Sequence, residues 1–176
     1  MRKSILLAAA LLFGTAGFAQ WQPVGDKIKT PWADQVDPQN PLPEYPRPLM
    51  ERDRWQNLNG LWDYAIVPVG AQPEKYDGKI LVPFAVESSL SGVQKRLGGE
   101  NELWYSREFA VPAKWAGERV LLHFGAVDWK TDVWVNDVLV GRHTGGYTPF
   151  TFDITAALNK KGTNTLKVKV WDPTDV

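Results

Sequence analysis

Within residues 125–155, the side chains at 131, 133 and 135 alternate with those at 132, 134 and 136, which is the period of a β-strand with two different faces. Every second residue from 131 to 135 is β-branched, so these side chains share one face of an extended segment. Asn136 and Asp137 follow, and both residue types tolerate the positive φ angles of a two-residue hairpin turn. The pattern predicts a hairpin with strands at 131–135 and 138–140.

A third strand is predicted after Gly145 and Gly146, where Phe150, Phe152 and Ile154 alternate with polar residues. Three antiparallel strands joined by tight turns cannot bury their apolar face by themselves. The remaining chain must therefore supply an opposing layer.

The same alternation recurs in four further stretches. It predicts strands at 62–66, 103–109, 120–124 and 166–170, and a short apolar run that ends at Pro83 predicts a fifth strand at 79–82. The strand at 120–124 is expected to pair with the strand at 103–109, which precedes it in the chain. Eight short strands with almost no helix indicate an all-β fold, a β-sandwich of the jelly-roll type.

The composition favours a single globular domain and argues against several classes of protein. The chain has 176 residues, a formal net charge of zero and 44% hydrophobic residues, which fits one globular domain. That charge argues against nucleic acid as a partner. There is no cysteine, so the core has to supply the stability without disulfides. A glycine-rich phosphate loop and a G-x-S-x-G motif are absent, which argues against nucleotide enzymes and serine hydrolases.

Residues 1–19 are predicted to be a secretory signal peptide. Arg2 and Lys3 precede an apolar run from Ile5 to Phe13, and small residues near Ala19 form a cleavage site. A membrane anchor is the alternative, but spanning a bilayer takes about 20 apolar residues and this run is shorter. We therefore expect export to the periplasm or the extracellular space, with no membrane association after cleavage.

Residues 20–50 are predicted to be extended. Five prolines fall between Pro38 and Pro48, and each fixes φ and removes a backbone donor, which excludes a helix or a central strand. Apolar residues are spaced through this segment, namely Trp21, Trp32, Leu42 and Tyr45. Their presence favours a segment docked on the domain surface over a disordered leader. The jelly roll itself is expected over residues 51–176.

Several motifs of the chain occur together, in the same order, in one known family. They are WQNLNGLWDYAI, ILVPFAVESSLSGV, LWYSREFAVP, HFGAVDWKTDVWVNDVLVGRHTGGYTPFTFDIT and NTLKVKVWDPTD. Through these motifs, residues 44–176 resemble the amino-terminal sugar-binding domain of glycoside hydrolase family 2, which includes β-galactosidases and β-glucuronidases. The resemblance implies a galactose-binding-domain-like jelly roll that precedes an immunoglobulin-like domain and a catalytic barrel.

The resemblance places the catalytic chemistry outside this chain. A (β/α)8 barrel takes about 250 residues, which exceeds the 176 residues present, and the last strand of the jelly roll is expected to be missing too. Retaining hydrolysis needs two carboxyl groups across the scissile bond, and the family carries both on the barrel. We therefore assign no catalytic residue here. The expected role is to support and rim the sugar pocket of a retaining, β-galactosidase-like exo-β-glycosidase of carbohydrate catabolism.

The expected partners are a β-linked glycoside or oligosaccharide and the downstream domains of the parent chain. A stand-alone carbohydrate-binding or adhesion module, with no enzyme attached, is the alternative. Neither a cofactor nor a metal is expected, because His123 and His143 are far apart in sequence and no cysteine accompanies them. A structural role is favoured for His143.

Four acidic residues and one tryptophan are the candidate ligand-binding residues, namely Glu87, Asp128, Trp129, Asp172 and Asp175. Glu87 lies in the long loop after residue 82, and a long loop inside a compact domain is more often functional than idle. Asp172 and Asp175 lie where the chain leaves the last predicted strand. Capping of turns by aspartate and serine side chains is the alternative for these loops, and it is favoured.

Two further groups of residues allow two interpretations each. Asp128 and Asp132 share a face if one strand contains both, but a hydrogen-bonded turn residue followed by a solvated strand position is the favoured reading. The tryptophans at 104, 129, 134 and 171 can stack on a pyranose. Packing in the core or at a domain interface is favoured for them, because aromatic rings dominate the energetics of a sandwich core.

Overall fold

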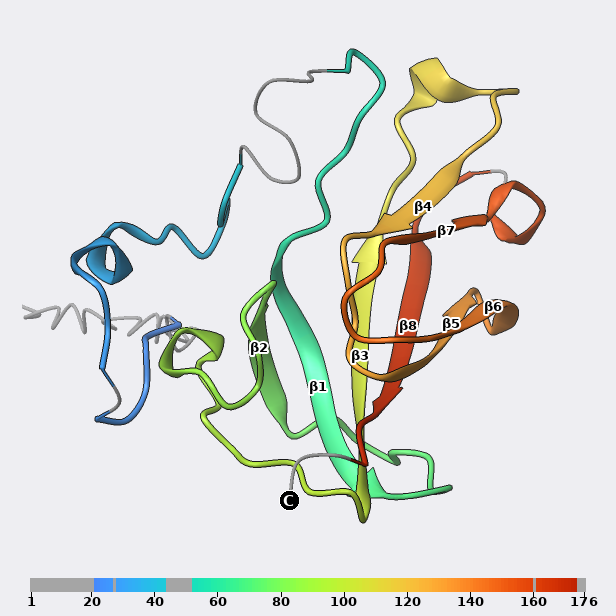
Figure 1. Ribbon diagram of the computed structural model, residues 1–176. Coiled ribbons are helices and arrows are strands. Elements are labelled where there is room, and N and C mark those ends of the chain that lie inside the picture. Colours follow the sequence, from blue (N-terminus) through green and yellow to red (C-terminus); the bar gives the residue numbers. More distant parts are fainter. Residues whose placement is uncertain (1–20, 27, 44–51, 160, 174–176) are drawn as a thin grey trace, which may run out of the picture.

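A computed structural model of the chain describes residues 21–26, 28–43, 52–159 and 161–173 (Figure 1). These residues contain eight strands: β1 (Gly60–Pro68), β2 (Gly78–Val82), β3 (Asn101–Phe109), β4 (Leu121–Phe124), β5 (Lys130–Val135), β6 (Val138–Thr144), β7 (Phe150–Asp153) and β8 (Asn164–Trp171). The only helical elements described are four short 3-10 turns: η1 (Pro31–Gln35), η2 (Ser89–Ser91), η3 (Ala113–Trp115) and η4 (Thr155–Ala157). The all-β prediction and its eight strands are confirmed.

The strands form two layers, as a jelly-roll sandwich requires. Six antiparallel strands make a large sheet in the order β2-β1-β3-β8-β5-β6, and β4 pairs with β7 in a small second sheet. In Figure 1 the small sheet lies toward the side of β8, whereas β1 and β2 lie away from it. The small sheet is therefore placed to cover only part of the large one.

The hairpin prediction is confirmed in its turn chemistry. Asn136 and Asp137 have φ angles of 49° and 65°, which are the left-handed values that a two-residue type I′ turn requires. The side chain of Asn136 also accepts a hydrogen bond from the backbone N–H of Thr165 at 2.9 Å and donates to the Asn164 side chain at 2.8 Å. The turn is thus tied to the start of β8.

Two predicted pairings are wrong. β4 pairs with β7 rather than with β3, and β7 lies in the small sheet rather than beside the β5–β6 hairpin. The reason is that β3 already has β1 and β8 as neighbours, so both of its edges are occupied. The connection through Gly145 and Gly146 carries the chain from one layer to the other, where the apolar side of β7 faces the large sheet.

The core lies between the layers. The large sheet contributes every second residue of its strands, including Trp62, Leu103, Val133, Val135, Leu166, Val168 and Val170, all of which are buried. Leu122 of β4 and Ile154 after β7 pack against them from the small sheet. The predicted inward face of β5 is confirmed, because Val133 and Val135 are completely buried.

One side of the sandwich is closed by direct contact between the sheets. The ring of Phe152 on β7 occupies the space that a Cβ at Gly141 of β6 would need. Nearby, the rings of His143 and Phe150 stack with their centroids 4.2 Å apart. β6 and β7 are therefore held together where the chain passes between the layers.

The outer face of the large sheet carries a buried ionic row. Asp132 is 5% exposed, and its carboxylate oxygens lie 3.2 Å from Arg142 Nε on β6 and 3.2 Å from Lys169 Nζ on β8. Lys169 also pairs with Glu102 at 3.3 Å. The prediction that Asp132 is solvated is wrong, because its two neighbouring strands place a cation on either side of it.

Two of the four tryptophans pack on this same outer face. The rings of Trp104 and Trp134 stack with their centroids 5.3 Å apart and their planes 16° from parallel, and Trp104 is buried. The packing interpretation is right for this pair, although the rings pack outside the sandwich core.

The amino-terminal part is described only from Trp21, so the predicted signal peptide lies outside the described residues, as do residues 44–51. Trp21 and Val24 contact the loop between β2 and β3. Trp32 on η1 is 68% exposed. Within the described ranges, no helix has the length and apolar character needed to cross a membrane.

Candidate functional site

A cavity of about 1530 Å³ opens between the two sheets. Its lining comes from β1, β3, β8 and the small sheet, together with residues 52–59 and the loop that follows β2, and it includes the apolar core side chains Leu103, Leu122, Val168 and Val170. Residues of β5 and β6 do not contribute to it. The cavity exists because two short strands cannot cover the inner face of a six-stranded sheet.

Three of the five candidate residues line this one cavity. They are Glu87, Asp128 and Asp172, which come from three segments far apart in the sequence. Asp172 is buried, Glu87 is half-buried and Asp128 is exposed, and each of them also interacts with another group of the protein. Trp129 does not line the cavity, and Asp175 lies outside the described residues.

Glu87 is carried by the loop Pro83–Leu97, which we call the Glu87 loop. Tyr105 on β3 lines the same cavity, and its ring meets that of Trp62 edge-on with the centroids 6.4 Å apart. Burial, and to a smaller extent the charge of Glu87, raises the pKa of the Tyr105 hydroxyl well above its ordinary value of 10.0. The Tyr105 hydroxyl therefore stays protonated and can donate a hydrogen bond.

The role of Tyr105 was not predicted from the sequence. Its alternation with neighbouring residues shows only that it lies on the inner face of a strand. That this inner face borders a polar-rimmed cavity depends on where the second sheet ends.

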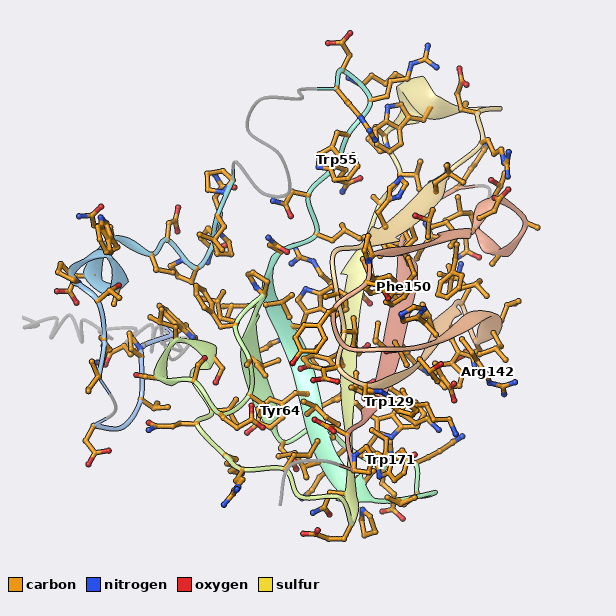
Figure 2. The ribbon with its side chains drawn as sticks, viewed as in Figure 1. Trp55, Tyr64, Trp129, Arg142, Phe150 and Trp171 are labelled. Carbon is orange, nitrogen blue, oxygen red and sulfur yellow. The ribbon has the colours of Figure 1, made fainter. Side chains whose placement is uncertain are left out.

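Asp128 lies against the loop that leads into β7. A Cβ at Gly146 would overlap the Asp128 carboxylate, and the backbone N–H of Gly145 donates to the carbonyl of Trp129 at 2.9 Å. These contacts tie residues 128–129 to residues 145–146. The Trp129 side chain, which is labelled in Figure 2, is 40% exposed, so it is available to a ligand or to another protein surface.

Trp171 is fixed by packing. Its Nε1 donates to the carbonyl of Gly99 at 2.8 Å, and the next residue along the chain is Asp172, which lines the cavity. Gly99 also lies close to Pro173, because a Cβ there would be 3.3 Å from the Pro173 Cα. The exit segment is thus held against the loop before β3, which supports the packing interpretation for Trp171.

Basic and aromatic residues that sequence reasoning missed also line the cavity, among them Arg52, Trp55 and His123. Trp55 stacks on His123 of β4 with the ring centroids 5.6 Å apart, and the Arg52 guanidinium lies 5.8 Å from the Trp55 ring. His123 Nδ1 lies 2.8 Å from the Thr151 hydroxyl. Partial burial, followed by the charge of Arg52, lowers the pKa of His123 below its ordinary value of 6.5.

No group of three or more His, Asp or Glu side chains within the described ranges is arranged to hold a metal ion. His143 stacks on Phe150 and lies 3.2 Å from the Thr148 hydroxyl through Nε2. These contacts give His143 a structural role, as predicted.

What the cavity can do follows from its lining. It combines apolar walls with a protonated phenol and five carboxyl groups, those of Asp53, Glu87, Glu118, Asp128 and Asp172. Such a mixture of apolar surface and polar groups is typical of ligand pockets. Its volume exceeds the roughly 300–1,000 Å³ of common small-molecule sites. A ligand would therefore occupy the rim rather than fill the whole space.

Comparison with known proteins agrees with this architecture. Residues 52–176 match the family model "Glycosyl hydrolases family 2, sugar binding domain". A β-glucuronidase of Paenibacillus borealis is 30% identical over 118 residues, which is 63% of this chain and 20% of that protein. A β-galactosidase of Thermoanaerobacter pseudethanolicus is 48% identical over 52 residues, or 30% of this chain and 7% of that protein.

A solved structure supports the same assignment. The β-glucuronidase of Faecalibacterium prausnitzii superposes with a TM-score of 0.57 and 30% identity over 70% of this chain, which corresponds to 22% of that chain. The present chain spans about a fifth of the length of these β-glucuronidases. With the family model covering most of its residues, the chain belongs to glycosyl hydrolase family 2, of which it represents the sugar-binding domain.

Proposed function

We propose that this chain is the amino-terminal sugar-binding domain of an exported, retaining exo-β-glycosidase, and that it rims the pocket in which a β-linked sugar is cleaved. The observation that carries the proposal is the convergence of Glu87, Asp128 and Asp172 on one cavity. Relatives that bear the names β-glucuronidase and β-galactosidase support a β-glycoside as the substrate class.

The polar groups of the rim suit the hydroxyls of a sugar. Carboxylates accept hydrogen bonds from hydroxyl groups, and a protonated Tyr105 donates one. Hydrogen bonds to charged groups contribute about 1.5–3 kcal/mol each. We assign binding and orientation to these residues and no step of bond cleavage, which requires a separate pair of carboxyl groups.

Binding and catalysis are tested separately on the purified chain. Titration with methyl β-D-glucuronide and methyl β-D-galactoside measures binding, and we expect Glu87→Gln and Asp172→Asn each to weaken it by about fivefold or more. Glu74→Gln is the matched control, because Glu74 is exposed and does not line the cavity. No binding of either sugar, or equal binding by all variants, would refute the proposed rim.

Hydrolysis is measured with 4-nitrophenyl β-glucuronide and β-galactoside. We expect no release of nitrophenol above a mock preparation. Turnover by the purified chain would overturn the assignment of catalysis to another part of the parent protein.

The open side of the sandwich suits a further strand. Among the described strands β4 pairs with β7 alone, so the other edge of β4 can accept a neighbour, and such a strand would cover apolar residues that now line the cavity. We expect a version of the chain extended along the parent gene to melt at a higher temperature. Equal melting temperatures would contradict this.

Export is proposed on the sequence of residues 1–19. Amino-terminal sequencing of the protein recovered from the periplasm or the medium of an expressing bacterium is expected to begin at Gln20. Retention of Met1 would contradict it.

A further inference from the structure

We infer that residues 21–25, which we call the amino-terminal clasp, position Glu87 by holding the Glu87 loop from its outer side. The inference rests on the proposed function in one respect, because the proposed function supplies the sugar that Glu87 would bind. Its structural part is independent of any ligand and rests on contacts between two segments more than 60 residues apart in sequence.

The Glu87 loop is first organised from within by Ser91. This residue is completely buried, and its hydroxyl donates to the carbonyl of Ser88 at 2.8 Å or of Val86 at 3.1 Å. The same hydroxyl accepts hydrogen bonds from the backbone N–H groups of Val93 and Gln94 at 3.0 and 3.3 Å. Because Val86 and Ser88 flank Glu87, this one hydroxyl holds the backbone next to Glu87 through whichever of the two carbonyls accepts its proton.

Further backbone contacts complete the internal framework. The N–H of Lys95 donates to the carbonyl of Val86 at 3.1 Å, and the N–H of Ser88 donates to the carbonyl of Ala85 at 2.9 Å. The loop is closed across its own base in this way. All of these bonds lie within the loop, and Val86 and Leu97 attach it to the sheets because both side chains are buried in the core.

The clasp adds a contact from outside the loop through Val24 and Ser89. The N–H of Val24 donates to the carbonyl of Ser89 at 3.1 Å, and the Ser89 hydroxyl donates to the carbonyl of Val24 at 2.6 Å. Ser89 is buried and Val24 is half-buried, so both bonds are partly shielded from water. The two segments are joined at this point by one backbone bond and one bond from a side-chain hydroxyl.

Two glycines make room for the clasp. A Cβ at Gly92 would lie 2.6 Å from Nε1 of Trp21, so the indole occupies the space that a larger residue would need. On the other segment, Gly25 lacks the Cβ that would overlap the side-chain amide of Gln94. Each segment thus has a glycine where the other inserts a side chain, which is the fit of an interface rather than of a chance contact.

The consequence concerns the geometry of the site. A loop is in general more mobile than the strands of a compact domain. Anchored from within by Ser91 and from outside by the clasp, it presents Glu87 beside Tyr105 at the rim of the cavity. A segment that contributes no residue to the ligand site therefore determines how well that site is preorganised.

Hydrogen exchange of the whole chain tests the structural part. We expect Trp21→Ala to accelerate exchange of the amides of residues 86–95 by about tenfold, while the strands of the large sheet keep their protection. Trp21→Phe is expected to restore most of the protection, because a phenyl ring can fill much of the same space. Trp32→Ala is the matched control, since Trp32 belongs to the same amino-terminal segment but is 68% exposed.

Two further variants keep the test decisive. Ser89→Ala removes one hydrogen bond, and we expect about fivefold faster amide exchange in the Glu87 loop. This variant still tests the clasp if Trp21→Ala fails to fold. In a double-mutant cycle, Gly92→Ala should cost less stability when Trp21 is already alanine, because only the strain of its φ of 79° then remains. Unchanged loop exchange in Trp21→Ala and Ser89→Ala, or strict additivity of the cycle, would overturn the clasp.

Sugar titration tests the functional part. With methyl β-D-glucuronide and methyl β-D-galactoside as probes, Trp21→Ala is expected to weaken binding about fivefold in the native chain and not at all in a Glu87→Gln background. Equal weakening in both backgrounds would contradict action through Glu87. If the native chain binds neither sugar, the proposed function fails, while the exchange data still decide whether the clasp exists.

Discussion

The ionic row on the outer face of the large sheet allows a sharp stability prediction. Asp132→Asn keeps the shape of the side chain but removes its charge and places an amide against Arg142 or Lys169. Removing one partner of a fully buried pair typically costs about 3–5 kcal/mol. Two features lower the cost here: Lys169 retains Glu102 at 3.3 Å, and the Arg142 side chain is 66% exposed.

We therefore expect Asp132→Asn to lower the free energy of unfolding by about 2 kcal/mol. For a chain of this size, that loss corresponds to a decrease in melting temperature of about 4–8 °C. Urea unfolding at equilibrium measures the free energy, provided that the m-value of the variant matches that of the native chain. The magnitude follows from the burial of the carboxylate and from the partners left behind.

Asp137→Asn is the matched control. Asp137 pairs with Lys167 at 2.7 Å, but its side chain is 81% exposed, so the loss should stay below about 1 kcal/mol. Salt distinguishes the two ion pairs further, because about 1 M salt screens the attraction in the exposed pair and affects the buried pair much less. Equal losses for the two variants at low salt would refute the argument that burial sets the strength of this row.

Three other predictions follow from the core, the Asp128 contact and the small sheet. Val133→Ala should lower the free energy of unfolding by about 2 kcal/mol or more in urea titrations, because the side chain is completely buried. Gly146→Ala should destabilise the chain and alter sugar titrations, because its methyl group displaces the Asp128 carboxylate. Hydrogen bonds from Thr155, then from Arg119, lower the pKa of Asp153 from 3.8 to about 2. The folded state thus binds this proton less readily than the unfolded state, and the stabilisation is present above pH 3.8 and lost as the pH falls toward 2.

Each of these predictions has a control. Val138→Ala truncates the same side chain at a position that is 53% exposed, and its cost should be within about 0.5 kcal/mol. Gly78→Ala meets only the Tyr64 ring at 3.5 Å, an ordinary contact, and should be tolerated. In Asp153→Asn, the free energy of unfolding should depend less on pH between pH 2 and 4 than it does in the native chain. If the free energy of unfolding depends on pH equally in that variant, Asp153 is not responsible for the loss of stability in acid.

Local sequence patterns predicted most of the fold elements. The alternation along β3, β5 and β8 identified strands and their inward faces because a strand points its side chains to opposite sides in turn. The Asn136–Asp137 turn was predictable for a similar reason, since the φ angles of a tight hairpin restrict the residue types. Both signals lie within a few residues of one another in the chain.

Local sequence patterns did not predict which distant strands pair. Alternation in β4 and β7 shows that each has an apolar face, but it does not name the sheet against which that face is buried. The burial of Asp132 depends likewise on β6 and β8, which bring Arg142 and Lys169 beside it. An alternating pattern predicts that a charged residue is exposed to solvent, and only its neighbours on the adjacent strands show whether it is buried.

The amino-acid sequence by itself determined the strands, their inward faces, the hairpin turn and the family resemblance, since each depends on residue types at short or fixed spacing. The tertiary structure alone decided which strands pair, where the cavity opens, and that Glu87, Asp128 and Asp172 share its rim. It also decided that residues 21–25 hold the loop of Glu87. The physical reason is that these features arise from contacts between segments far apart in the chain, whose free energy is set by packing and burial in the folded state rather than by local conformational preference.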